Sequence, residues 1–295
     1  MAITTQDQIV SAFSSGKRHS YDWNKITGAT SAYTAGRWYD FSGLNGTPVA
    51  NAWAGTALNW TACDEATGNG TQIFGIRHGG NVTPDIKHIV TNAALTAVAT
   101  GVPGFFKLID ICGYYPGINM NVATVQNLVG TPTLRYTNGN GVRAFLSVTT
   151  ATGATAHNLS MSYTNQAGTS GRTLPVTVSC TASAIVGHIT HSGTAANNYG
   201  WHLPMANGDF GIRSVQSVQL SAASGAAGVA ALVLAREIAT IPVLQASVAS
   251  ERDLINQFPS MEIIPDGACL ALLYFAGAAT ATNSNFYGNV QTIWG

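Results

Sequence analysis

The segments 159–164 and 176–180 alternate apolar and polar residues. In the first, Leu, Met and Tyr alternate with Ser and Thr, and in the second the apolar positions hold Val, Val and Cys. In a β-strand successive side chains point to opposite faces, so a period of two indicates a strand with one buried face. These segments are therefore predicted to be half-buried strands, separated by a turn over 165–171.

Further strands are predicted from β-branched, aromatic and bulky apolar residues between Gly, Asn and Pro. They cover 86–98, 105–115, 212–220 and 269–275, whereas 230–238 fits a strand or a helix. Val215 and Val218 lie three residues apart, which indicates an irregularity in that strand. The run Asn138-Gly139-Asn140-Gly141 predicts a hairpin between 133–136 and 142–149, because Asn and Gly tolerate positive φ. Many short strands favour a mainly β fold with a β-sandwich or jelly-roll core.

A short helix is predicted near the start of the chain. Thr4 or Thr5 can cap it, Asp7 suits its first turn, and Gly16 can end it. Its apolar residues at helical spacing are Ile9, Val10 and Phe13. A helix this short is unstable alone, so it should pack on its own domain or on a neighbouring subunit.

The segment 17–80 is irregular and rich in aromatic residues. It could form short strands and turns that cover one end of the β core. Alternatively, it could be an extended arm whose aromatic side chains anchor on another subunit, with 27–36 as a flexible tether. The candidate interface residues are Ile9, Val10, Phe13, Tyr21, Trp23, Trp38, Tyr39, Trp53 and Trp60. We therefore divide the chain into a helix and arm (1–80) and a core (81–295), with one continuous domain as the alternative.

The composition changes the expected function. Apolar residues make up 46% of the chain, charged residues only 9%, and the net charge is zero, whereas soluble domains average roughly 25% charged residues. A neutral, hydroxyl-rich surface costs less to bury than a charged one. We therefore expect the chain to work by assembling with other proteins, the alternative being a monomer with a hydroxyl-rich surface.

Charge and targeting signals exclude other classes. Lys17, Arg18 and Lys25 are the nearest approach to a basic patch, so neither nucleic acid nor a membrane surface is an expected partner. The first residues lack the pattern of a signal peptide, so we expect synthesis in the cytoplasm without secretion. The four cysteines are widely spaced and are expected to be unbridged.

No constellation of residues predicts catalysis. Asp64 and Glu65 are adjacent and would point apart on a strand. His188, His191 and His202 form the only grouping that resembles metal ligands, without a supporting Cys or carboxylate at a familiar spacing. Nucleophile and phosphate-binding motifs are missing from the sequence. We therefore expect no enzyme activity, no metal and no cofactor.

Three stretches resemble virion structural proteins of tailed bacteriophages. They are MAITTQDQIVSAF followed by GKR, LSMSYTNQAGTSGRT at 159–173, and GDFGIRSVQSVQLSA at 208–222. The segment 30–80 departs from that resemblance. The resemblance implies a homo-oligomeric capsid decoration or cement protein in the virion, whose partners are the major capsid protein and copies of itself. The alternatives are a neck, tail or baseplate protein, or a carbohydrate- or receptor-binding β-sandwich that uses the aromatic residues of 21–60.

Overall fold

The computed structural model describes residues 3–29, 32–65, 75–97, 101–193, 200–253, 255 and 261–295. The chain is 46% strand and 4% helical, which confirms the predicted mainly β fold. Within the described residues the strands form three antiparallel sheets, and the helices are α1 (Gln6–Ser14) and the 3-10 turn η1 (Thr137–Gly139). None of the described helices is long and apolar enough to cross a membrane.

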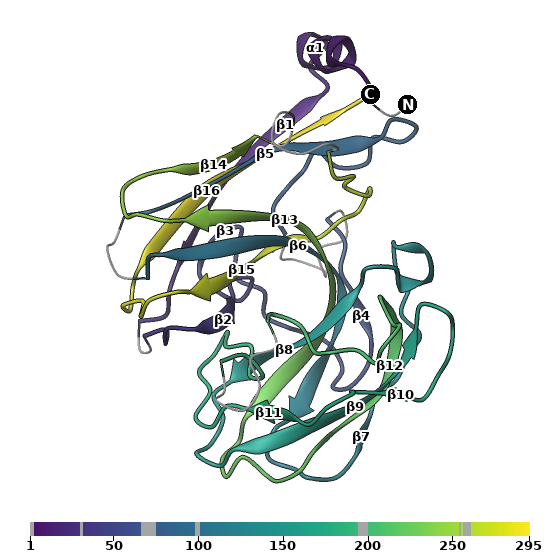
Figure 1. Ribbon diagram of the computed structural model, residues 1–295, viewed down its shortest axis with the longest axis vertical. Helices are drawn as coiled ribbons and strands as arrows, with labels where there is room; N and C mark the ends of the chain where they lie inside the picture. Colours follow the sequence, from purple (N-terminus) through teal and green to yellow (C-terminus); the bar gives the residue numbers. More distant parts are fainter. Residues whose placement is uncertain are drawn as a thin grey trace.

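The central sheet has the order β2-β15-β6-β13-β8, with β4 paired to β6 (Figure 1). Its strands are β2 (Arg37–Asp40), β4 (Thr61–Ala62), β6 (Gly104–Asn119), β8 (Arg143–Thr150), β13 (Val229–Val243) and β15 (Leu270–Ala276). Register shifts interrupt the long β6–β13 pair at three places, such as between Leu234 and Ala235. Bulges of this kind bend and twist a strand pair, so the two halves of one pair can pack against two different sheets.

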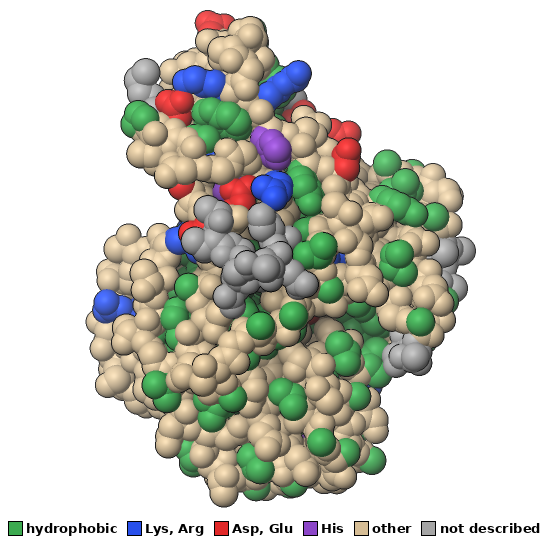
Figure 2. Space-filling view, turned by 180° about the vertical axis from the view of Figure 1, so that it is seen from behind, with side chains coloured by type: hydrophobic (Ala, Val, Ile, Leu, Met, Phe, Trp, Pro, Cys, Tyr) green, Lys and Arg blue, Asp and Glu red, His purple; other side chains and the backbone are tan. Residues whose placement is uncertain are grey.

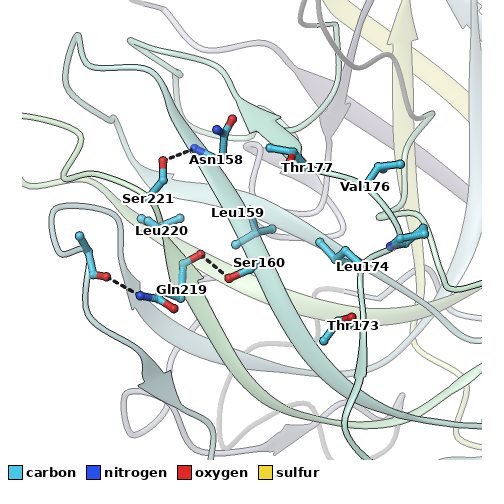
Figure 3. Close-up of a pocket in the computed structure, with 12 residues that line it drawn as sticks. Asn158, Leu159, Ser160, Thr173, Leu174, Val176, Thr177, Gln219, Leu220 and Ser221 are labelled. Carbon is cyan, nitrogen blue, oxygen red and sulfur yellow. Dashed lines mark hydrogen bonds between the residues drawn. The ribbon is translucent and has the colours of Figure 1, made fainter.

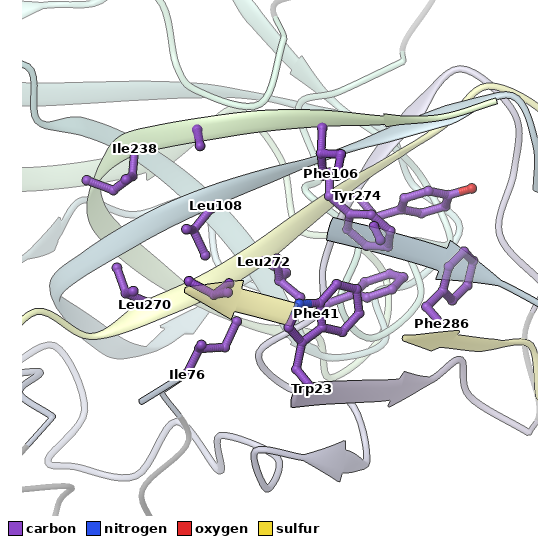
Figure 4. Close-up of a cluster of buried hydrophobic side chains, with 14 of the residues drawn as sticks. Trp23, Phe41, Ile76, Phe106, Leu108, Ile238, Leu270, Leu272, Tyr274 and Phe286 are labelled. Carbon is purple, nitrogen blue, oxygen red and sulfur yellow. The ribbon is translucent and has the colours of Figure 1, made fainter. Parts of the chain in front are cut away.

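The terminal sheet, with the order β14-β5-β16-β1-β3, packs on the first half of β6. Its strands are β1 (Arg18–Ile26), β3 (Gly46–Thr47), β5 (Lys87–Thr96), β14 (Ser250–Asp253) and β16 (Asn285–Trp294). Figure 4 shows the core between the two sheets, where Trp23 and Phe286 meet Phe106 and Tyr274 around Phe41. This is the first sandwich.

The distal sheet, with the order β10-β9-β12-β7 and β11 paired to β9, packs on the second half of β6 and β13. Its strands are β7 (Gln126–Asn127), β9 (His157–Asn165), β10 (Arg172–Thr173), β11 (Val178–Cys180) and β12 (Ile212–Leu220). The central sheet is thus shared by two sandwiches that lie at opposite ends of the molecule (Figure 1).

Residues 187–190 close the central sheet into a ring. The Ile189 amide donates to the Trp38 carbonyl of β2 at 3.0 Å, and the Val148 amide of β8 donates to the His188 carbonyl at 3.1 Å. Inside this ring, large side chains such as Trp38, Phe145 and Trp201 form a third core. Because the ring removes both free edges of the central sheet, these strands are not exposed to edge-to-edge pairing.

Most predicted strands are present, but the hairpin prediction is wrong. The segment 133–136 is not a strand, and the first Asn-Gly pair lies in η1, with φ of 58° at Asn138 and 69° at Gly139. A Cβ on Gly139 would lie 2.2 Å from the Ile212 carbonyl oxygen. The Asn-Gly residues therefore provide positive φ for a turn that docks closely against β12 instead of joining two strands.

Helix α1 begins as predicted, at a capping box formed by Thr5 and Gln8. Ile9, Ala12 and Phe13 pack with Val90 and Ile293 of the chain's own terminal sheet. Val10 was predicted to share this face, but it is 67% exposed. The correction follows from helix geometry, since positions i, i+3 and i+4 share a face and position i+1 does not.

The aromatic-rich segment runs extended through β1, β2, β3 and β4, and it packs on its own core. Trp23 of β1 is 1% exposed and packs in the core between the terminal and central sheets. Tyr33 stacks on Tyr39 with ring centroids 3.8 Å apart. Residues 18–62 therefore form strands and turns that cover a core, which is the first of the two alternatives. Residues 27–36 were predicted to be a flexible tether, but Tyr33 within them is buried and stacked. Residues 30 and 31 of that segment lie outside the described residues. Because β1 pairs with β16 and β2 with β15, the division at residue 80 does not separate two sheets.

Candidate assembly surface

Charged residues are scarce in the part of the chain that builds the distal sheet. From residue 120 to residue 228 the sequence holds only Arg135, Arg143, Arg172, Asp209 and Arg213. Arg172 pairs with Asp209 at 2.9 Å, and Arg135 pairs with the buried Asp110 at 2.6 Å. In the face shown in Figure 2 the charged side chains gather toward the end that carries α1, and the opposite end shows few.

Strand β9 explains how this surface arises. Its alternate residues Leu159, Met161 and Tyr163 are buried in the distal core, which confirms the predicted half-buried strand. The intervening side chains Asn158 and Ser160 are exposed, with Ser162 and Thr164 half-buried. The alternation therefore places a row of amide and hydroxyl groups on the outer face of the sheet.

Strand β12 continues the same surface beside β9. Register shifts lie between Ile212 and Ser214 and between Val215 and Ser217, which confirms the expected irregularity. They let Val215 and Val218 both point into the core although three residues separate them. Gln219 remains on the outside, where its side-chain amide donates to the Ala123 carbonyl at 3.1 Å.

A groove of about 700 Å³ lies between these strands and the segment 173–177 (Figure 3). None of its lining residues is charged; they are Ala123, Asn158, Leu159, Ser160, Thr173, Leu174, Pro175, Val176, Thr177, Gln219, Leu220 and Ser221. Local hydrogen bonds hold its floor, such as Asn158 N–H to Ser221 Oγ at 2.9 Å. Ser, Thr, Asn and Gln side chains both donate and accept, so the surface can bond a partner of the same chemistry.

Apolar side chains lie at the borders of this surface. Val125 is 51% exposed and Val176 is 44% exposed. Val125 borders a small hollow with Ser160 and Ser217, and Val176 lines the main groove beside Leu174. We call the outer face of β9 and of residues 214–220 of β12, together with Val125 and the segment 173–177, the neutral face; the exposed Arg213 lies outside it.

The residues predicted as interface anchors lie elsewhere, and most are inaccessible. Trp23, Trp38, Tyr39 and Trp53 are buried within their own chain, which prevents direct contact of these side chains with a sugar or a neighbouring subunit. Val10 is exposed, and Ile9, Phe13, Tyr21 and Trp60 are half-buried against the chain's own clusters. The structure does not bring these residues together. The long run with few charges and the Ser/Thr alternation of 159–164 were the sequence signals that could have identified the neutral face.

Of the residues considered for chemistry, Glu65, His188 and His191 are buried, and Asp64 and His202 are half-buried. Burial lowers the pKa of His188 and of His191 to about 3, with Arg37 close to the first and His202 close to the second. Among the described residues, no group of three or more His, Cys, Asp or Glu side chains is arranged to hold a metal ion. Glu65 is buried and accepts from the His78 backbone amide at 2.8 Å, so it faces the protein interior.

Comparisons with known proteins provide little further guidance. No protein-family model matches the chain, and a search of curated proteins finds no significant match. Among solved structures, a likeness is found to the VP2 subviral particle of infectious bursal disease virus, with 9% sequence identity and a TM-score of 0.16. The alignment covers 94% of this chain and 80% of that chain. A TM-score this low supports no statement about fold or function.

Proposed function

We propose that this chain is a structural component of a tailed-phage virion, a capsid decoration or cement protein that assembles with copies of itself and with the major capsid protein. The observation that carries the proposal is the neutral face. It is a sheet surface with a groove whose lining residues carry no charge. The resemblance of 159–173 and 208–222 to virion structural proteins falls on the two strands that form it.

The physical case concerns the cost of desolvation. Burying an unpaired charge costs far more than burying a hydroxyl or amide that finds a hydrogen-bond partner. Side chains such as Ser160 and Gln219 can exchange hydrogen bonds with the same groups on a second copy. A self-complementary patch is what a two-fold symmetric interface requires. The proposed occupant of the neutral face is therefore a second copy of the chain.

The test places a charge on this face without disturbing the core. Ser160→Arg and Gln219→Arg introduce guanidinium groups at exposed positions of β9 and β12. Val10→Arg is the matched control, because Val10 is equally on the surface but lies on α1 at the other end of the molecule. We expect the unaltered chain and the control to sediment as an oligomer, and the two face variants to be monomers with unchanged melting temperature.

A chain that is monomeric at every concentration, or face variants that keep the same oligomer, would contradict the use of this face. The virion assignment is tested separately, by co-sedimentation of the chain with particles that lack it. Labelling of intact particles with antibodies distinguishes a capsid position from the alternative neck, tail or baseplate position.

A further inference from the structure

Lys87, the first residue of β5, has a fully buried side chain at 0% exposure. Its Nζ lies 2.8 Å from His78 Nδ1 and 3.5 Å from Asp266 Oδ1, and it also donates to the Gly80 carbonyl. A lysine is rarely buried without a strong partner, and here the amine meets both a carboxyl group and an imidazole. Burial lowers the pKa of Lys87, which favours the unprotonated amine.

The partners of His78 determine which of its ring nitrogens can accept a proton. Nε2 lies 2.8 Å from the Ala268 carbonyl oxygen and 3.2 Å from Glu65 Oε2, and both of these atoms are acceptors. We therefore assign the ring proton to Nε2, which leaves Nδ1 as the acceptor that faces Lys87. A carboxylate that orients a histidine beside a nucleophile is the arrangement by which enzymes activate weak nucleophiles.

Asp266 is held at the other side of the amine by hydrogen-bond donors. Its Oδ2 accepts from Thr83 Oγ1 at 2.6 Å and from the Thr83 amide at 3.2 Å, while Oδ1 accepts from the Val82 amide at 3.1 Å. Burial raises the pKa of Asp266, but these donors and Lys87 together lower it, so proton transfer to this carboxylate is the uphill step of the reaction proposed below. The same donors would stabilise negative charge on the carboxyl oxygens during attack by an amine.

From this geometry we infer that Lys87 and Asp266 join in an intramolecular isopeptide bond. The ammonium of Lys87 first gives a proton to the Asp266 carboxylate, which produces a neutral amine and a carboxylic acid. Nζ then attacks Cγ while His78 Nδ1 takes a proton from the nitrogen and returns it to the departing hydroxyl. The new N–C bond replaces a C–O bond, and one water leaves, so no other reagent is needed.

The two groups are in contact. Nζ lies 3.5 Å from Oδ1, an oxygen bonded to Cγ, and the reaction requires Nζ and Cγ themselves to come within roughly 3–3.5 Å of each other. The bond would tie the start of β5 to the segment that precedes β15, and so would join the terminal sheet to the central sheet. It forms within one chain, so it does not depend on the assembly proposed above.

Another lysine–carboxylate pair provides an internal comparison. Lys17 Nζ lies 2.6 Å from Asp85 Oδ2, closer than Lys87 Nζ lies to Asp266 Oδ1. The two carboxyl groups are similarly exposed, at 22% and 24%, but the Lys17 side chain is 44% exposed and that of Lys87 is 0% exposed. Water stabilises the Lys17 ammonium and opposes the transfer of its proton to the carboxylate. We therefore expect Lys17 and Asp85 to remain unlinked in the same molecule.

The experiment is mass spectrometry of the purified full chain under denaturing conditions. We expect the intact mass to be one water below the mass of the sequence, and a tryptic digest to contain a branched peptide that joins Lys87 to Asp266. Asp85 lies in the same tryptic peptide as Lys87, so Lys17 should be absent from the branched peptide and should be recovered in a peptide of its own. Lys87→Arg and Asp266→Ala should restore the full mass, and His78→Gln should leave most molecules unlinked.

A full sequence mass for the unaltered chain would overturn the inference, whether or not any variant folds. Asp266 precedes Gly267, and an Asp-Gly pair can lose water by closing a ring on its own backbone. A chain that is one water lighter but yields no branched peptide would therefore also overturn it.

Discussion

Arg135 binds the buried carboxylate of Asp110 through two hydrogen bonds, Nε to Oδ2 at 3.1 Å and Nη2 to Oδ1 at 2.6 Å. Asp110 lies on β6 between Leu108, which belongs to the terminal core, and Cys112, which belongs to the distal core. The Tyr136 hydroxyl and the Cys269 amide complete its hydrogen bonding at 2.9 Å and 2.8 Å. One saturated ion pair thus occupies the place where the two sandwiches meet.

Removal of one partner from this pair should be strongly destabilising. Arg135→Ala leaves a fully buried carboxylate without its counter-ion, and loss of one member of a buried pair costs about 3–5 kcal/mol. The control is Lys17→Ala in the pair with Asp85, where Lys17 is 44% exposed and little or no loss is expected because water screens the pair. Urea unfolding followed by tryptophan fluorescence measures both. Equal losses for the two variants would contradict the role assigned to Arg135.

The sequence predicted strands best where one face is buried and the other is solvated. In β9 the alternation of Leu, Met and Tyr with Ser and Thr is such a case. In β1 the alternation is hidden, because Lys25 occupies a buried position and is stabilised by bonds to the Leu44 and Pro48 carbonyls at 3.0 Å and 2.7 Å. A pattern analysis treats such a lysine as exposed, since its partners come from a distant segment.

The candidate interface was harder to predict, for a physical reason. Trp and Tyr bury the most apolar area per residue, so they are favoured both at interfaces and in cores. In this chain Trp23 completes the core between the terminal and central sheets, and Trp38 completes the core inside the ring. Ser160 and Gln219 carry no comparable signal, because a single exposed Ser or Gln is ordinary in any soluble protein.

Two neighbouring residues of α1 should respond differently to the same change. Ile9 packs in the small cluster beneath the helix, whereas Val10 points to solvent. Ile9→Ser should lower the free energy of unfolding by about 1–2 kcal/mol through lost apolar burial. Val10→Ser should change it by less than about 0.5 kcal/mol. Thermal melts of the two variants decide this, and a larger loss for Val10→Ser would show that another surface covers the helix.

The cysteine thiols should be unreactive in the folded chain. All four are buried and free, and burial raises the pKa of Cys63 and Cys112 and brings that of Cys180 to about 11. Because the thiolate is the reactive form, a thiol reagent should label them slowly before unfolding and completely in denaturant without reductant. Fewer than four labelled thiols in the denatured, unreduced chain would show that some are bridged.

Acid should destabilise the folded chain through two buried histidines. In the folded chain the pKa of His188 and His191 is about 3, against an ordinary value of 6.5. Below pH 6.5 the unfolded state therefore binds protons that the folded state excludes. The stability that comes from keeping these rings neutral is complete above that pH and is lost progressively as the pH falls toward 3.

Between about pH 7 and about pH 5, each of these rings should lower the free energy of unfolding by roughly 2 kcal/mol. Asp209 has a lowered pKa, so its contribution is lost only near and below 3.8 and does not interfere. Urea unfolding at the two pH values should show the loss in the unaltered chain and a smaller loss in His188→Gln/His191→Gln. Part of the loss should persist in that variant, because burial also lowers the pKa of His78, His157 and His202. An equal loss of unfolding free energy in both proteins would contradict this prediction, because it would mean that His188 and His191 accept protons in the folded chain as readily as in the unfolded chain.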